Sequence, residues 1–269
     1  MTSTRLSFIG LNIGNTRTQI GRFVDGAPTA ERKIDNADVR LVLAAVLEEC
    51  RALGGEGRTI VVVASVNDRV ASQVESGLAD TGKVDLYRIG EDLPVPIGTR
   101  LDPETITGVD RLLNAAAAFA VMKQACVIVD AGTAVTVDFV DGEGTFHGGA
   151  IAPGARMQLK SMHGGTAALP ELDFRAPDDE PFGRNTAQAM LQGVFHGIRG
   201  LVWKLVERYA ESYGAFPPVI ATGGDAATLF QGDGLVDRIV PDLTLRGMAE
   251  AVRQSLDSPN DEAATHDHG

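Results

Sequence analysis

One short pattern occurs twice in this chain and constrains its fold more than any other feature. The first copy is LNIGNTRT (residues 11–18) and the second is VDAGTAVT (residues 129–136). Each copy ends an apolar run with Asn or Asp, has a glycine two residues later, and continues to a threonine. Such a run, turn and return is typical of two strands joined by a tight turn. A chain that carries this unit twice is expected to fold as two similar halves.

Strand-like and helix-like segments alternate in both halves, which indicates an α/β fold. The sequence predicts strands at 7–13, 18–23, 59–64, 84–89, 125–129, 133–140, 148–154 and 218–221. It predicts helices at 36–53, 68–78, 110–123, 155–162, 186–213 and 243–256. We place the domain boundary after residue 122, giving domains 1–122 and 123–257. The polar segment 258–269 is expected to be a disordered tail.

Composition narrows the class of protein. The 269 residues are 44% hydrophobic and 22% charged, as in a soluble protein with a real core. The net charge of −12 disfavours a nucleic-acid binder. No apolar run approaches the ~20 residues of a membrane helix, and the start resembles no signal peptide, so we expect a cytoplasmic protein. Cys50 and Cys126 are expected to be buried free thiols.

The duplicated turn suits phosphate binding. A glycine after a buried strand lets backbone N–H groups approach an anion, and threonine hydroxyls add donors. For a single copy, a plain hairpin turn is the simpler interpretation. Two copies facing each other across a cleft would suit a polyphosphate, and a carboxylate at a strand end would hold a cation.

Three further stretches could contribute to a site. In TGVDR (107–111), Asp110 could accept a proton from a hydroxyl and Arg111 could hold an anion, although a helix cap and a surface pair are the simpler interpretations. TGGD (222–225) would permit close approach of a base or ribose, or be an ordinary turn. GRNT (183–186) would by default cap a helix through Asn185 or Thr186.

Taken in order, these motifs resemble the type III pantothenate kinases. This family is related to the Bvg accessory factor and lies within the acetate kinase/sugar kinase/Hsp70/actin superfamily. The resemblance runs from about residue 7 to 256. It rests on NIGNTRTQ, GVDR, DAGTAVTVD, GGAIAPG, GRNT and ATGGD.

The resemblance implies two ribonuclease H-like domains facing a central cleft, in a homodimer. It implies transfer of phosphate from ATP to pantothenate, the first step of coenzyme A biosynthesis, with Mg²⁺ accompanying ATP and a monovalent cation, K⁺ or NH₄⁺. The ATP-binding residues it implies are Asn12, Ile13, Gly14, Asn15, Thr16, Arg17, Thr18, Gln19 and Thr133. The pantothenate-binding residues are Gly108, Val109, Asp110 (the catalytic base), Arg111 and, across the dimer interface, Thr186. Asp130 would bind the monovalent cation.

Two departures from the family pattern keep other functions open. The family has aspartate where this chain has Asn12, a change that should weaken support of the magnesium–ATP complex. A tyrosine that commonly precedes the GxDR motif is missing from residues 98–103. The alternatives are a catalytically impaired nucleotide-binding or regulatory homologue, which Asn12 favours, and a kinase of another small alcohol, which the missing tyrosine favours.

Overall fold

The computed structural model describes residues 6–54 and 57–257, which form two compact units. Unit 1 contains the described residues up to Pro96 and those from Leu245 onward, and unit 2 runs from Ile97 to Thr244. Each unit is built on its own mixed sheet, which confirms the predicted α/β class. The tail predicted at 258–269 lies outside the described residues.

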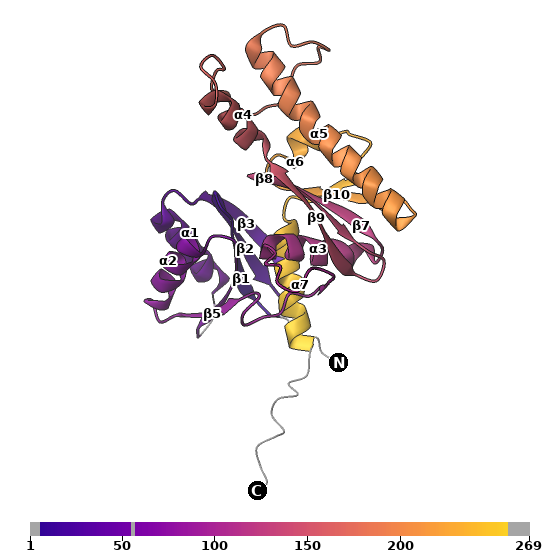
Figure 1. Ribbon diagram of the computed structural model, residues 1–269. Coiled ribbons are helices and arrows are strands. Elements are labelled where there is room, and N and C mark those ends of the chain that lie inside the picture. Colours follow the sequence, from indigo (N-terminus) through magenta and orange to yellow (C-terminus); the bar gives the residue numbers. More distant parts are fainter. Residues whose placement is uncertain (1–5, 55–56, 258–269) are drawn as a thin grey trace. The chain divides into compact units, whose positions relative to one another are not determined.

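Unit 1 contains, among its described residues, a five-stranded sheet of order β3-β2-β1-β4-β5 (Figure 1). The strands are β1 (Phe8–Ile13), β2 (Arg17–Val24), β3 (Ala27–Asp35), β4 (Thr59–Ser65) and β5 (Val84–Arg88). The helices are α1 (Val39–Leu53) and α2 (Asp68–Ala79). Strand β1 is antiparallel to β2 and parallel to β4, and its Ile9, Leu11 and Ile13 are buried in a core shared with α1 and α2. The end of β1 is thereby fixed.

Unit 2 contains, within the described chain, a six-stranded sheet of order β11-β10-β7-β8-β9-β6. The strands are β6 (Gly98–Thr99), β7 (Cys126–Ala131), β8 (Ala134–Val140), β9 (Thr145–Pro153), β10 (Val219–Thr222) and β11 (Arg238–Ile239). The helices are α3 (Val109–Met122), α4 (Ala155–Gly164), α5 (Thr186–Tyr213) and α6 (Ala226–Phe230). Helix α7 (Leu243–Asp257) begins in unit 2 and continues into unit 1.

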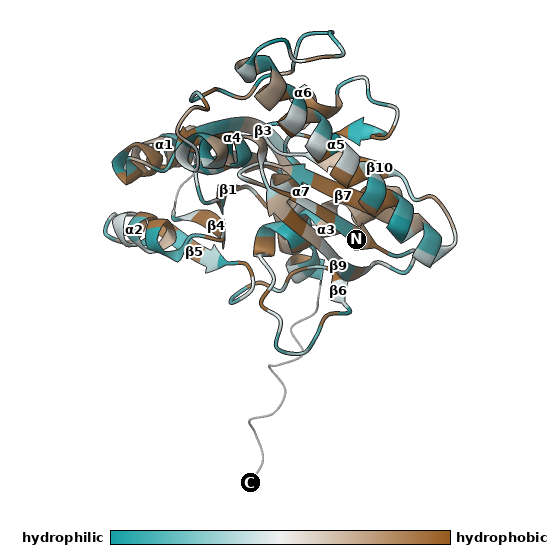
Figure 2. Ribbon diagram, turned by 45° about the horizontal axis from the view of Figure 1, so that its top comes forward, coloured by the Kyte–Doolittle hydropathy of each residue, from teal (hydrophilic) through white to brown (hydrophobic). Residues whose placement is uncertain are grey.

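The sheet of unit 2 is covered on both faces. Successive side chains of a strand point to opposite faces, and β7 follows this rule. Val127 and Val129 join the core beneath α4, α5 and α6, whereas Cys126 and Ile128 join the core beneath α3. Figure 2 shows the apolar colouring of β7 in the middle of this sheet. A strand buried on both faces reads as a continuous apolar run, as ACVIV does.

The two compact units do not coincide with the predicted boundary after residue 122. Helix α3 packs against β7 and β8, and its alanines share a core with Cys126 and Ile128 of β7, so it belongs to unit 2. Helix α7 follows unit 2 in sequence, yet its Leu245 and Met248 lie over Gly10 and Gly21 of the unit 1 sheet. Because unit 1 is built from two separate stretches of chain, a single boundary cannot describe it.

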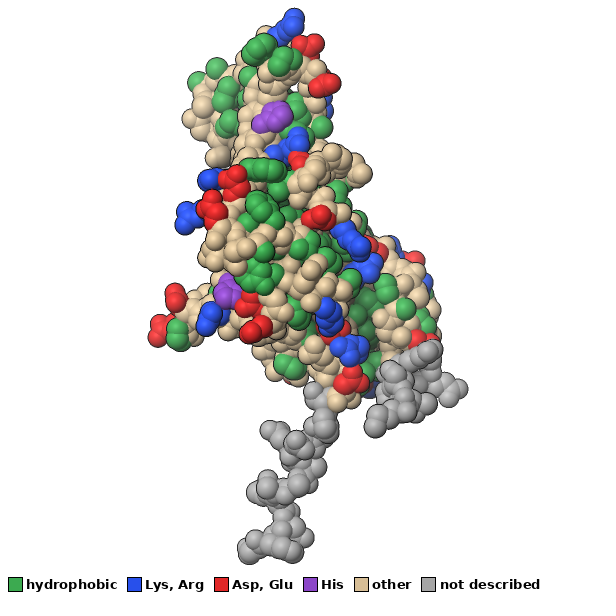
Figure 3. Space-filling view, turned by 90° about the vertical axis from the view of Figure 1, so that its right-hand side faces the viewer, with side chains coloured by type: hydrophobic (Ala, Val, Ile, Leu, Met, Phe, Trp, Pro, Cys, Tyr) green, Lys and Arg blue, Asp and Glu red, His purple; other side chains and the backbone are tan. Residues whose placement is uncertain are grey.

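The surface carries charges of both signs. On the face drawn in Figure 3, Lys and Arg side chains are interspersed with Asp and Glu rather than gathered into a basic patch. Within the described ranges, no helix combines the length and the apolar character needed to cross a membrane.

Candidate active site

The first duplicated turn joins β1 to β2 in unit 1. The Gly14 N–H donates to the carbonyl of Arg17 at 3.0 Å, which closes the turn. Asn15, Thr16 and Arg17 are exposed. Ile13 and Thr18, also predicted to bind ATP, are buried, so only their backbones could meet a ligand.

The carbonyls of this turn are tied to neighbouring elements. Asn36 Nδ2 donates to Gly14 O at 2.8 Å, the Asn36 N–H donates to Thr16 O at 2.9 Å, and Asn67 Nδ2 donates to Asn15 O at 3.4 Å. In a trans peptide the N–H points opposite to the carbonyl, and the described chain has no cis peptide. The N–H groups of these three peptides therefore point away from the asparagines, as an anion-binding turn requires.

Asn12 lies at the end of β1, half-buried, opposite Gln19. Its Nδ2 donates to Gln19 Oε1 at 3.5 Å, and Gln19 Nε2 donates to Glu31 Oε1 at 2.8 Å. Glu31 is itself paired with Lys33 at 3.1 Å. Position 12 therefore offers a neutral amide oxygen. The carboxylate at the end of these hydrogen bonds, Glu31, is already paired with Lys33.

The second duplicated turn joins β7 to β8 in unit 2. The Gly132 N–H donates to Ala134 O at 2.9 Å, which closes the turn in the same way as the first. Thr133 is exposed at its tip. The Gly154 N–H donates to Thr133 O at 3.1 Å, so the backbone before α4 supports the turn.

Two glycines let their backbones approach this second turn closely. A Cβ at Gly154 would lie 2.2 Å from Gly132 O. A Cβ at Gly223 would lie 2.4 Å from Ala131 O, and the φ of Gly223 is +94°, which only glycine adopts readily. The close approach observed at Gly223 is to the protein's own backbone, and the approach of a base or ribose to TGGD stays a prediction.

Asp130 is positioned by helix α3. Asn114 Nδ2 donates to Asp130 Oδ2 at 3.0 Å, and Thr244 Oγ1 donates to Asn114 Oδ1 at 2.7 Å. The Thr244 hydroxyl fixes which end of the Asn114 amide faces Asp130, because the oxygen of the amide is already accepting. Among the described residues no three His, Cys, Asp or Glu side chains converge on a metal site.

Asp110 lies in the first turn of α3. Its Oδ1 accepts the Arg111 N–H at 2.8 Å, and no side chain of the described residues donates to it. Burial raises the pKa of the Asp110 carboxyl, an effect that the Arg111 hydrogen bond and charge only partly offset. A carboxylate without a side-chain partner and with a raised pKa is suited to accept a proton.

Arg111 extends from α3 to the sheet. Its Nε lies 3.1 Å from Asp138 Oδ2, and its Nη2 donates to Asp138 Oδ1. Its guanidinium carbon lies 5.6 Å from the ring centre of Phe146, a cation–π contact. No role was predicted for Asp138 or Asn114, although Asp138 ends the motif DAGTAVTVD. The period of 2 along this strand was a usable signal, since it places Asp130's partner Thr136 and Asp138 on one face.

A second ion pair lies beside the second turn. Arg156 Nη1 lies 2.5 and 2.7 Å from the two carboxylate oxygens of Asp225, which is buried. The Asp225 N–H donates to Ala131 O at 2.9 Å. This pair links the starts of α4 and α6 and was not predicted.

Thr186 is the predicted site residue that the structure does not bring to the others in unit 2. It begins α5, capped by Asn185 Oδ1, which accepts the Gln188 N–H at 2.9 Å. It lines a groove of about 700 Å³ between α4 and α5, together with Met157, Met162 and Met190. Asp110 and Arg111 lie on α3, which covers the opposite face of the sheet. Within one chain, Thr186 and Asp110 are therefore separated by the sheet.

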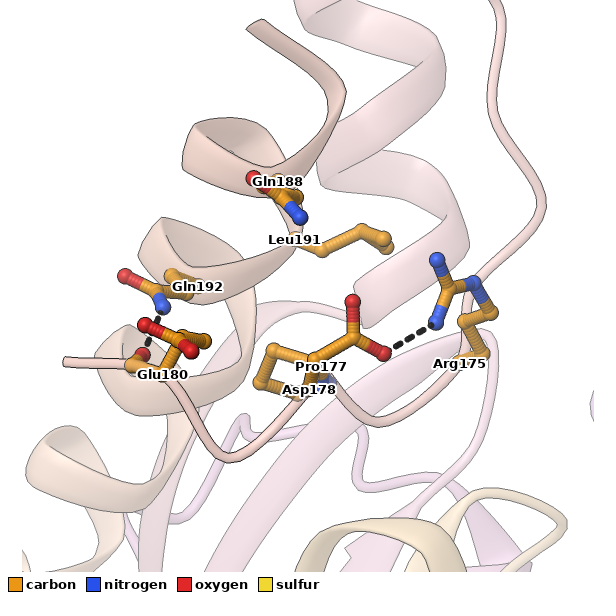
Figure 4. Close-up of a pocket in the computed structure, with 7 residues that line it drawn as sticks. All are labelled: Arg175, Pro177, Asp178, Glu180, Gln188, Leu191 and Gln192. Atoms are coloured by element: carbon orange, nitrogen blue, oxygen red, sulfur yellow. Dashed lines mark hydrogen bonds and ion pairs between the residues drawn. The ribbon is translucent and has the colours of Figure 1, made fainter. Parts of the chain in front are cut away.

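A smaller cavity lies near the start of α5. Figure 4 shows its lining by Arg175, Pro177, Asp178, Glu180, Gln188, Leu191 and Gln192. Its volume of about 10 Å³ admits about one water molecule. This cavity is no substrate site.

Comparison with known proteins extends the sequence resemblance. A family described as type III pantothenate kinase matches residues 8–208. The type III pantothenate kinase of Akkermansia muciniphila is 34% identical over 93% of this chain and 100% of its own length.

Two solved structures show the fold. A Baf family protein from Campylobacter jejuni has a TM-score of 0.62 and 19% identity, covering 93% of this chain and 100% of its own. MreB 5 of Spiroplasma citri, solved with AMPPNP, has a TM-score of 0.51 and 11% identity, covering 94% of this chain and 98% of its own. The fold is that of the actin-like ATPases, as predicted.

Proposed function

Because this chain belongs to the type III pantothenate kinase family, we propose that it transfers the γ-phosphoryl group of ATP to pantothenate. The products are ADP and 4'-phosphopantothenate, in the first step of coenzyme A biosynthesis. The observation that carries the proposal is Asp110: a carboxylate of raised pKa, with no side-chain donor in the described part of the chain, at the position where the family motif has its base. The reaction would take place in the cytoplasm, where ATP is available.

Asp110 would act as the general base. Its free oxygen takes the proton of the pantothenate hydroxyl as that oxygen bonds to the γ-phosphorus. The bond from this phosphorus to the β–γ bridging oxygen breaks, and ADP leaves with the electron pair. Such a step depends mainly on in-line positioning and on neutralising charge.

The remaining groups of the GVDR segment would bind the acceptor. Pantothenate carries a carboxylate, and Arg111 keeps one nitrogen, Nη1, without a hydrogen bond among the described residues. An Arg nitrogen donating to a carboxylate is a strong, charge-assisted contact. Gly108 and Val109 precede Asp110 at the start of α3 and would line the same place.

The two duplicated turns would hold the ATP phosphates. The supporting observation in the first turn (12–19) is the outward direction of its N–H groups, and in the second it is the exposed Thr133. Mg²⁺ would arrive with ATP and offset its charge. The neutral Asn12 fits a contact through bound water better than direct ligation, since Mg²⁺ favours carboxylates.

Asp130 would hold the monovalent cation, K⁺ or NH₄⁺. The supporting observation is the Asn114–Thr244 chain of hydrogen bonds, which orients one oxygen of Asp130. The cation would supply positive charge next to the phosphates that Thr133 contacts.

A homodimer would complete the acceptor site. Thr186 and Asp110 lie on helices that cover opposite faces of one sheet, so a single chain cannot bring both to one substrate. The groove beside Thr186 is apolar, and Met157 is 45% exposed in it, as expected of a surface that a second chain covers.

The test is pantothenate-dependent ADP release by the purified protein with magnesium–ATP and K⁺, measured beside an Asn12→Asp variant. ADP release by the wild type that requires pantothenate as the acceptor supports the proposal. If neither protein releases ADP with pantothenate, the proposal is overturned.

Asn12 favours a second candidate, a catalytically impaired nucleotide-binding or regulatory homologue. This candidate would be supported if the wild type binds magnesium–ATP without releasing ADP, while the Asn12→Asp variant releases ADP. ADP release with a different small alcohol, and none with pantothenate, would instead identify a kinase of that alcohol.

A further inference from the structure

Asp138 is a buried carboxylate to which the proposed reaction gives no role. It lies on β8, its side chain is 2% exposed, and it holds Arg111 through two guanidinium nitrogens. We propose that Asp138 is a positioning residue: it keeps Arg111 off Asp110 and turns the free Nη1 of Arg111 toward the carboxylate of the acceptor. This inference rests on the proposed function.

The geometry of the Arg111–Asp138 pair leaves one edge of the Arg111 guanidinium available to a ligand. Nε and Nη2 face the two oxygens of Asp138, a side-on, bidentate arrangement. The ring of Phe146 lies against the guanidinium, 5.6 Å from its carbon. Only 15% of the Arg111 side chain is exposed. With one edge and one face covered, Nη1 is the nitrogen left for a ligand.

The strand opposite makes room for this carboxylate. Asp138 pairs with Gly149 across β8 and β9. A Cβ at Gly149 would lie 2.6 Å from Asp138 Oδ1 and 2.0 Å from Val137 O. Glycine at 149 therefore allows the carboxylate to lie flat on the sheet beneath Arg111, so two elements besides α3 are shaped around the pair.

Without the charge of Asp138, Arg111 would pair with Asp110. The two are neighbours on α3, and the pKa of Asp138 is itself raised, first by burial and also by the Asp110 charge. The charged and titratable groups that face this cluster are Asp110 and Arg111 from α3 and Tyr209 from α5. Asp138 balances Arg111 so that Asp110 stays available as the base.

The test is the Asp138→Asn variant, which keeps the shape of the side chain and removes its charge. We expect the KM for pantothenate to rise about 10- to 100-fold, the loss of an aligned charge-assisted hydrogen bond. The affinity for ATP, measured by calorimetry, should not change. The acidic limb of the pH profile of kcat/KM should move to lower pH, because Asp110 then faces Arg111 without a competing negative charge.

A matched control is Asp233→Asn. Asp233 pairs with Arg199, whose Nε lies 2.7 Å from Asp233 Oδ2, in the same unit but outside the site. This variant should lose stability without moving the pH profile. If Asp138→Asn alters stability alone, with KM and pH profile as in the wild type, the inference is overturned.

A second experiment covers the case in which Asp138→Asn does not fold. The double variant Arg111→Met, Asp138→Leu removes both charges and leaves no buried ion unpaired. If Asp138 acts only through Arg111, the double variant has the same pantothenate KM as Arg111→Met alone. A further loss in the double variant contradicts the inference. A wild type without pantothenate-dependent turnover contradicts the proposed function instead.

Discussion

At the scale of single residues, Asp110 is the proposed general base, and its substitution tests the chemistry most directly. Asp110→Asn should lower kcat about 10²- to 10⁴-fold, the contribution of a positioned general base, and leave ATP affinity unchanged. Because burial raises the pKa of the Asp110 carboxyl, wild-type kcat/KM should fall as pH drops through a value above the ordinary range of Asp. Steady-state kinetics from pH 4 to 9 checks this, and a flat profile would contradict it.

Asn114 links Asp130 to Thr244, and it is 1% exposed. Asn114→Ala should cost about 1–3 kcal/mol of unfolding free energy, because a buried donor and acceptor lose their partner. It should also raise the K⁺ concentration for half-maximal activity, since Asp130 loses the bond that orients it. Thr244→Ser, which keeps the hydroxyl, is the control. An unchanged K⁺ response in Asn114→Ala would rule out this role.

The two cysteines are free thiols, as predicted, but only Cys126 is buried, whereas Cys50 on α1 is half-buried, contrary to the prediction. Burial raises the pKa of Cys50 to about 11 and that of Cys126 to about 12. Since the thiolate is the reactive form, neither should react with a thiol reagent in the native protein at pH 7. Two equivalents should react after denaturation, and rapid native labelling would contradict the prediction.

At the scale of elements, helices were the most predictable part of the fold. The helix predicted at 186–213 has these bounds in the structure, because a long apolar stripe begins at a capping Asn185 and ends at Gly214. Strand β3 was not predicted. Its residues alternate only between exposed and half-buried, and it is an edge strand that exists because β2 offers a partner. The two-residue strands β6 and β11 were missed for the same reason, because each pairs with a strand distant in sequence. The five-residue helix α6 was also missed.

The turn after β10 offers a matched pair of glycines. Gly223→Ala should destabilise the protein by more than about 2 kcal/mol and weaken ATP binding, because its Cβ would lie 2.4 Å from Ala131 O at a φ of +94°. Gly224→Ala should have little effect on either, since nothing lies within 4 Å of its Cβ. Thermal melts and ATP titrations compare the two. Equal effects of the two variants would contradict the conclusion that the close approach to Ala131 requires glycine at position 223.

At the scale of the whole molecule, the sequence predicted two halves but not how the chain divides between them. Helix α7 joins unit 1 although it follows unit 2 in sequence, because Gly10 and Gly21 leave space for Leu245 and Met248. The return of the chain to unit 1 cannot be predicted from the sequence of α7 alone, because it depends on glycines more than 200 residues earlier. The predicted site residues of unit 2 are tied together through α3, as the Asn114–Asp130 and Arg111–Asp138 bonds show, and Thr186 alone lies on the other face.

That separation predicts complementation between two inactive variants. Asp110→Asn removes the proposed base of one chain, and Thr186→Arg would block the proposed contact with the acceptor site of the other chain. In a mixed dimer, one site has Asp110 from the second chain and Thr186 from the first, so it is intact, while the other site carries both lesions.

Random mixing yields mixed dimers as half of the population, each with one working site, so activity should recover to about a quarter of that of the wild type. Activity assays after co-expression with two different affinity tags measure this. Lack of recovery, in dimers shown to be mixed, would mean that Thr186 serves its own chain or none. Recovery would establish that each acceptor site is built from two chains, the arrangement that we propose because α3 and α5 cover opposite faces of the unit 2 sheet.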